Sequence, residues 1–141
     1  MAEVMATLKR LGDTDLTVAR PEEDIRGRKV VDRQGEEVGK VDDLLIDDRE
    51  NKVRFLQVAS GGILGMGKDK SMIPVDAIQG MDEDTVHLDK TRADVASAPA
   101  YDPELASDRD YWGGVYGYYG YAPFWAGGYV YPAYPAYPRR F

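Results

Sequence analysis

The sequence contains no cysteine, and that absence excludes disulfide bonds and metal sites built on thiolates. It also has no apolar run close to the length of about 18 residues that a membrane-spanning helix needs. The N-terminal stretch MAEVMATLKRLGDTD lacks the apolar segment of a signal peptide. We therefore expect a cytoplasmic protein whose chemistry does not involve cysteine.

Acidic residues are absent from the end of the chain. All 25 lie at or before Asp110, together with 16 of the 18 Lys and Arg residues, so this part carries a net charge of −9. The segment from Tyr111 onward carries only Arg139 and Arg140, a net charge of +2. Because an acidic body repels phosphate backbones, we expect no nucleic acid as a partner.

Aromatic residues are nearly absent from the first hundred positions, where Phe55 stands alone. All 10 Tyr, both Trp and the other two Phe lie between Tyr101 and Phe141. This distribution predicts an aliphatic core of Val, Leu, Ile and Met for the body of the protein. It also predicts that the aromatic segment is a tail that can be separated from the folded unit.

Short apolar runs separated by turn residues fill the middle of the sequence. The runs predicted to be strands are residues 29–32, 38–46, 53–59, 71–75 and 85–89. Runs rich in Val, Ile, Leu and Phe at this spacing are typical of a small antiparallel barrel or sandwich. In the longest run, Val38 and Val41 would lie on opposite faces of a regular strand. Gly39 between them predicts a bulge that returns both to one face.

Several pieces of this region match a known family in their order and spacing. They are RGRKVVD at residues 26–32, GKVDDLLID at 39–47, KVRFL at 52–56, Gly61-Gly62 and Ile73-Pro74. With Thr91-Arg92 and Pro99-Ala100-Tyr101-Asp102 they resemble the PRC-barrel family over residues 21–102. That family is named for the cytoplasmic domain of the photosynthetic reaction centre H subunit. The resemblance implies a β-barrel that serves as a scaffold or docking module and not as a catalyst.

The flanking segments complete the predicted organisation. Residues 1–20 form a leader in which Val4, Leu8 and Leu11 have the spacing of a short amphipathic helix. Residues 21–100 form the PRC-type domain, and residues 101–141 form a short helix followed by a tail rich in Tyr, Gly and Pro. The predicted fold class is mainly all-β: a small antiparallel PRC-type β-barrel with a helical leader and an aromatic low-complexity tail.

Two helix starts are predicted after the last strand. Thr91 and Asp94 have the spacing of a capping box, and the helix that they open must end before Pro99. Asp102-Pro103 predicts a second helix that reaches Tyr111. From Trp112 onward we find neither helical nor strand periodicity, which favours a chain that is flexible at its glycines and polyproline-like at its prolines.

Three patterns suggest a catalytic or ligand-binding site, and each lacks an essential part. The loop at residues 62–68 matches GxxxxGK, but Asp69 stands where a phosphate-binding loop needs Ser or Thr. The acidic cluster at residues 42, 43, 47, 48 and 50 has Arg49 where an EF-hand loop needs a ligand, so residues 47–51 are interpreted as a solvated hairpin turn. His87 could act as the base of a serine nucleophile, but the sequence lacks the Gly-x-Ser-x-Gly motif that would supply this serine. We therefore predict no catalytic, cofactor-binding or metal-binding residue and no cofactor.

The aromatic residues of the tail are the remaining candidates for a functional site. We predict that Tyr118, Tyr119, Phe124 and Trp125 anchor self-association or the docking of a protein partner, because aromatic side chains bury large apolar areas. A peripheral contact with a membrane is less favoured, since Arg139 and Arg140 are the only cations of the tail.

Three functional classes follow from these observations. The favoured class is a non-enzymatic interaction or scaffold module, active as an oligomer or with a protein partner, in assembly or in a stress response. The resemblance implies one alternative, a role like that of the reaction-centre H subunit in support of a photosynthetic or other membrane complex. An enzyme with an acidic site is the least favoured alternative.

Overall fold

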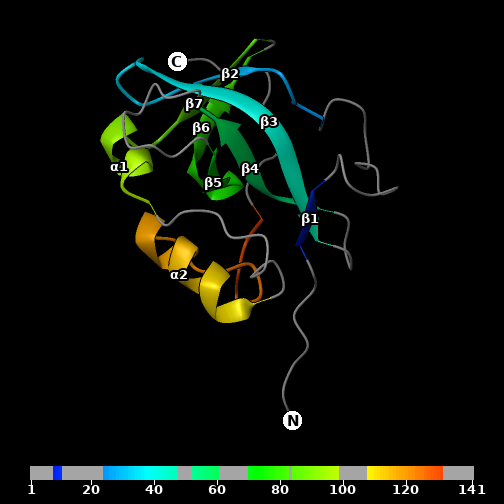
Figure 1. The fold of residues 1–141 in the computed structure, drawn as a ribbon. Helices are drawn as coiled ribbons and strands as arrows, with labels where there is room; N and C mark the ends of the chain where they lie inside the picture. Colours follow the sequence, from blue (N-terminus) through cyan, green and yellow to red (C-terminus); the bar gives the residue numbers. More distant parts are fainter. Residues whose placement is uncertain are drawn as a thin grey trace.

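In the computed structural model, the described residues are 8–10, 24–47, 52–60, 70–82, 84–98 and 108–131. They form the elements β1 (Leu8–Arg10), β2 (Lys29–Val31), β3 (Glu37–Asp47), β4 (Val53–Ala59), β5 (Lys70–Pro74), the 3-10 turn η3 (Val75–Ala77), β6 (Ile78–Met81), β7 (Thr85–Leu88), α1 (Arg92–Ala96) and α2 (Arg109–Tyr119). In Figure 1 the long strand β3 arches over the other strands, and α2 lies below the sheet.

The sheet is mixed rather than purely antiparallel. Its strand order is β5-β4-β3-β2-β7-β6, and β1 pairs with the far end of β3. Every neighbouring pair is antiparallel except β2 and β7, which are parallel, with Val30 opposite Val86. The prediction of an antiparallel barrel is wrong at this pair. The chain passes through four other strands between β2 and β7, and so long a connection allows the two to run in the same direction.

The two edge strands of this order, β5 and β6, are joined by the three residues of η3. So short a link keeps the ends of the two edge strands close together, and the sheet therefore has to curve. The hydrogen bonds among the described strands do not close it into a complete barrel. The curvature gives the sheet an inner face and leaves an outer face that a helix can cover.

The bulge predicted beside Gly39 is confirmed. The register between β2 and β3 shifts between Val30 and Val31, and Val38 is the extra residue on β3. Val38 and Val41 are both buried as a result.

The N-terminal segment differs from its prediction. Leu8–Arg10 form a strand along β3, with Leu8 opposite Asp47, where the sequence predicts a helix. The reason is that β3 extends beyond its pairing with β2, and the backbone groups of this extension need a partner. The rest of the predicted leader lies outside the described residues.

The two helices begin at capped residues. Thr91 and Asp94 form the predicted capping box at the start of α1. Asp108 caps α2 by accepting two backbone N–H groups of the first turn, and the helix ends at Gly120 in the left-handed conformation. This helix is later and longer than the predicted one, and it includes residues that the sequence pattern assigned to the low-complexity tail.

The helical signal in α2 is present in the sequence but obscured by glycine. Its buried residues, Trp112, Val115, Tyr116 and Tyr119, follow the spacing i, i+3, i+4 and i+7 of one helix face. Three of the remaining positions are glycine, which has a low intrinsic helix propensity. The helix therefore depends on the packing of its aromatic face rather than on its composition.

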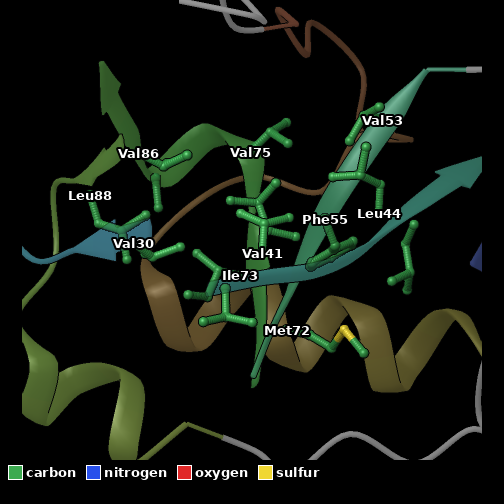
Figure 2. Close-up of a cluster of buried hydrophobic side chains, with 14 of the residues drawn as sticks. Val30, Val41, Leu44, Val53, Phe55, Met72, Ile73, Val75, Val86 and Leu88 are labelled. Carbon is green, nitrogen blue, oxygen red and sulfur yellow. The ribbon is translucent and has the colours of Figure 1, made fainter. Parts of the chain in front are cut away.

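Both faces of the sheet are covered. In β4 all residues from Val53 to Val58 are buried, and their side chains alternate between the two faces except at Arg54, where the register with β3 shifts. On the inner face, Val30, Val86 and Leu88 come together from β2 and β7 (Figure 2). The inner core is aliphatic, as predicted.

The outer face is aromatic, which the sequence pattern does not predict. The Phe55 ring lies 4.5 Å from that of Trp112 and 4.9 Å from that of Tyr116, measured between centroids. Met72 of β5 points towards the ribbon of α2, which contacts β5 (Figure 2). The prediction of a purely aliphatic core is therefore wrong, because α2 brings the aromatic residues of the tail onto Phe55.

Gly39 provides a test of this packing. A Cβ atom at this position would lie 2.3 Å from the carbonyl oxygen of Ala59, a backbone atom that cannot move aside. Gly39→Ala should lower the free energy of unfolding by about 1–3 kcal/mol, measured by urea denaturation. Gly114→Ala is the matched control, because the exposed Gly114 of α2 has no atom near such a Cβ. The control should raise the free energy of unfolding by about 0.5–1 kcal/mol. Equal midpoints for Gly39→Ala and the wild type would contradict the close approach of β3 and β4.

Asp32 links the turn after β2 to the start of α1. The residue is 2% exposed, and its carboxylate accepts the backbone N–H groups of Gln34 at 2.9 Å, Glu36 at 2.8 Å and Arg92 at 2.8 Å. Burial alone would raise the pKa of Asp32, but these three donors outweigh it and hold the pKa below its ordinary value. The ionised carboxylate therefore stabilises the fold above the ordinary pKa, and this stabilisation is lost as the pH falls through the lowered pKa.

The Asn variant of this residue tests that linkage. Asp32→Asn should lower the free energy of unfolding at pH 7 and flatten its decline in acid, because the group that takes up the proton is gone. Urea denaturation between pH 7 and pH 3 gives both quantities. A variant whose stability declines in acid as steeply as that of the wild type would show that Asp32 does not contribute in this way.

Candidate interaction surface

Arg54 is a buried cation at the second position of β4. Its side chain is 2% exposed, and its Nε donates a hydrogen bond of 2.8 Å to Asp47 at the end of β3, which is 1% exposed. The antiparallel pairing of β3 with β4 brings the two together, and the Asp47 N–H donates to the carbonyl of Lys52. A buried ion pair is stable only when surrounding groups replace the lost hydration, so the neighbours of Arg54 matter.

The residues after α2 supply those neighbours, and we call residues 121–131 the C-terminal strap. Three of its rings surround the Arg54 guanidinium. Its Cζ lies 4.4 Å from the ring centroid of Phe124, 5.3 Å from that of Tyr131 and 6.0 Å from that of Tyr129. Attraction between a cation and aromatic rings is strongest where water is excluded. The strap thus closes over the buried cation.

Two tyrosine hydroxyls fix the far end of the strap. The hydroxyl of Tyr129 donates to a carboxylate oxygen of Asp76 at 2.9 Å, and that of Tyr131 donates to the backbone carbonyl of Val53 at 3.0 Å. Within the strap, the Tyr129 N–H donates to the carbonyl of Ala126. The strap is therefore an ordered segment that joins the end of α2 to the start of β4.

Three further cations of the body lie close to aromatic rings of the strap. Each of the following pairs brings a cation to within 5.5 Å of a ring centroid: Lys90 and Tyr121 at 4.9 Å, Lys52 and Tyr131 at 5.0 Å, and Arg109 and Trp125 at 5.5 Å. The strap carries no acidic residue, whereas the body is acidic overall. The strap therefore packs beside four cations of the body, Lys52, Arg54, Lys90 and Arg109.

The structure divides the four predicted anchor residues into two pairs. Phe124 and Trp125 lie together in the strap, with ring centroids 5.1 Å apart, and both are partly buried. On α2, Tyr119 is 2% exposed and belongs to the core, whereas Tyr118 is 41% exposed. The hydroxyl of Tyr118 donates to the backbone carbonyl of Asp94. A contact between these residues and a partner stays a prediction. Tyr119 is buried within the chain and has almost no surface for such a contact.

Sequence reasoning missed the residues that hold the strap, namely Arg54, Asp76, Tyr129 and Tyr131. One signal was available. Arg54 is the only charged residue in the run VRFLQVA, whose apolar character indicates burial. A cation inside such a run requires partners, although the sequence does not say which they are.

The residues considered as metal ligands have separate partners. Asp42 binds Lys70, Asp47 binds Arg54, and Asp43 accepts the N–H of the next residue. The other two acids of the cluster lie outside the described residues. Within the described ranges, no group of three or more His, Asp or Glu side chains is placed to hold a metal ion.

The remaining candidates, which are His87, the glycine loop and a cavity beside β3, do not form a common site among the described residues. His87 is partly exposed, and its Nε2 lies 3.5 Å from a carboxylate oxygen of Asp82. The glycine loop at residues 62–68, with Asp69, lies outside the described residues. A cavity of about 520 Å³ beside β3 is lined by small residues and by side chains of both signs, namely Arg26, Gly27, Glu37, Gly39, Lys40, Val41, Asp42, Ala59 and Ser60. Its mixed charges single out no class of ligand.

A comparison with protein families identifies the domain. The model of the PRC-barrel domain matches residues 22–95, just over half of the chain. The chain belongs to the PRC-barrel family. This family is in general a non-catalytic one. No curated protein matches the chain. None of the helices among the described residues has the length and hydropathy that crossing a bilayer requires.

The energetic role of Arg54 can be measured by substitution. Arg54→Met keeps much of the side-chain volume but leaves Asp47 buried without its cation, so the free energy of unfolding should fall by about 3–5 kcal/mol. Arg26→Met is the matched control. Arg26 pairs with Asp24 at 2.7 Å on the surface, with side chains 39% and 32% exposed, and such a pair contributes about 1 kcal/mol or less. Similar losses for the two variants would contradict the buried role of Arg54.

Proposed function

We propose that this protein is a non-enzymatic interaction or scaffold module, in which the PRC-barrel domain presents an aromatic surface to a protein partner or to a second copy of the chain. One observation carries the proposal. Residues 121–131 contain no charged side chain, and none of them is fully buried although the strap is docked. We infer a role in assembly or in a stress response, in the cytoplasm.

The properties of the strap support a protein partner. Tyr, Trp and Phe are enriched in protein interfaces, where they supply large contact areas from side chains with few rotatable bonds. Within the part of the chain that the structure describes, the large hydrophobic residues that stand most exposed are Tyr118 at 41% and Val130 at 81%. Both flank or belong to the strap. An apolar surface of this kind is what an interaction site presents.

The positions of the rings separate a structural from a contact role. Phe124 covers Arg54, and Tyr119 lies in the core, so replacing either would damage the fold. Tyr118, Trp125 and Val130 are exposed or partly exposed. They are the residues whose replacement can weaken binding while the domain stays folded.

A triple variant tests the proposed function. Tyr118→Ser, Trp125→Ser and Val130→Ser together should reduce the oligomeric mass in light scattering or the recovery of a partner, while the circular dichroism spectrum stays that of the wild type. The control replaces three exposed residues away from the strap, Gln34, Lys40 and Asp84, by Ser and should change neither. A wild-type chain that is monomeric and recovers no partner, like the triple variant, would contradict the proposal.

A further inference from the structure

Asp76 lies beneath the strap, on the turn η3 that joins the two edge strands. One carboxylate oxygen accepts the hydroxyl of Tyr129 at 2.9 Å. The other, Oδ1, is buried and has no hydrogen-bond partner among the described residues. A carboxylate in this position satisfies only part of its hydrogen-bonding capacity, and an unsatisfied buried oxygen lowers the stability of its surroundings.

The charges around Asp76 do not balance. The groups that face it are Arg54 from β4, Tyr116 from α2, and Tyr121 and Tyr129 from the strap. Burial raises the pKa of each of these tyrosines, so all three remain neutral. The cation among these groups, Arg54, is already paired with Asp47. Asp47, Arg54 and Asp76 together therefore carry one surplus negative charge when Asp76 is ionised and none when it is protonated.

We propose that the strap is an acid-strengthened latch, which docks more tightly on the sheet when the Asp76 side chain takes up a proton. Protonation removes the surplus charge from a partly buried site in which Oδ1 is shielded from water. In agreement with this geometry, burial raises the pKa of Asp76, and it outweighs the opposing effects of the Tyr129 hydrogen bond and of Arg54. The stabilisation of the docked strap by this group is complete below the ordinary pKa of Asp and is lost as the pH rises through the raised pKa.

The strap is suited to open separately from the sheet. It follows Gly120, which ends α2, and its attachment to the rest of the chain consists mainly of rings and of two tyrosine hydroxyls. Segments with few backbone hydrogen bonds to the core open at a lower free energy than the global unfolding of the protein. If the strap is also the contact surface proposed above, its pH dependence sets when that surface can leave the sheet.

Hydrogen exchange of the strap amides tests the latch on the full chain. The N–H groups of Ala126 and Tyr129 donate to carbonyls within the strap and report on its order. Their protection factors should fall as the pH rises from about 4 to 7, while those of the β3 and β4 amides stay constant. In Asp76→Asn and Asp76→Ala, which cannot gain or lose a proton there, the strap protection should not vary with pH.

A matched control and a decisive outcome complete the test. Asp84→Asn, which removes an exposed carboxylate directly before β7, should keep the wild-type profile. Wild-type strap protection that is constant over this pH range, or Asp76 variants that keep the wild-type pH dependence, would overturn the latch. The wild-type profile decides alone if the Asp76 variants do not fold. A failed latch leaves the proposed function standing, because partner recovery and oligomeric mass are measured separately.

Discussion

The burial of Arg54 is the constraint on which the C-terminal part of this structure depends. A guanidinium 2% exposed to water needs a carboxylate and a surrounding that replaces its hydration. Asp47 supplies the first from the same hairpin, and the rings of Phe124, Tyr129 and Tyr131 supply the second. A buried cation in β4 thus explains why a segment far along the chain is ordered where it is.

The unequal composition of the chain has a physical meaning in this arrangement. The acidic body provides the cations Lys52, Arg54, Lys90 and Arg109, and the acid-free segment provides the rings that lie over them. A domain of about 80 residues buries only some 60–65% of its unfolded surface and has little stability to spare. Helix α2 and the strap enlarge the core by adding an aromatic layer to the outer face of the sheet. What looks like a separate tail in the sequence is therefore, in its described part, a layer of the same domain.

Local signals allowed the strands β2, β3, β4, β5 and β7, the bulge at Gly39 and the capping box at Thr91 to be predicted, because each depends on residues close together in the sequence. Strand β1 was predicted as a helix, and β6 was not predicted. The family was also recognisable from motifs in β2, β3 and β4. The parallel pairing of β2 with β7 could not be predicted, since the two strands are far apart in the sequence. Helix α2 was missed because glycine weakens its propensity while Phe55 stabilises its aromatic face. Aromatic content drew attention to the segment that forms the strap, but the contacts between Arg54 and the strap rings are long-range and leave no local trace.

The central claim is that the aromatic segment completes the folded domain, and shortening the chain tests it most directly. Equilibrium unfolding in urea should be compared for the full chain, a chain that ends at Gly120 and one that ends at Asp110. We expect the loss of residues 121–141 to lower stability while unfolding stays cooperative. The further loss of α2 exposes Phe55 and the outer face of the sheet, and it should abolish cooperative unfolding. A chain ending at Asp110 that unfolds cooperatively at the urea concentration of the full chain would contradict the account.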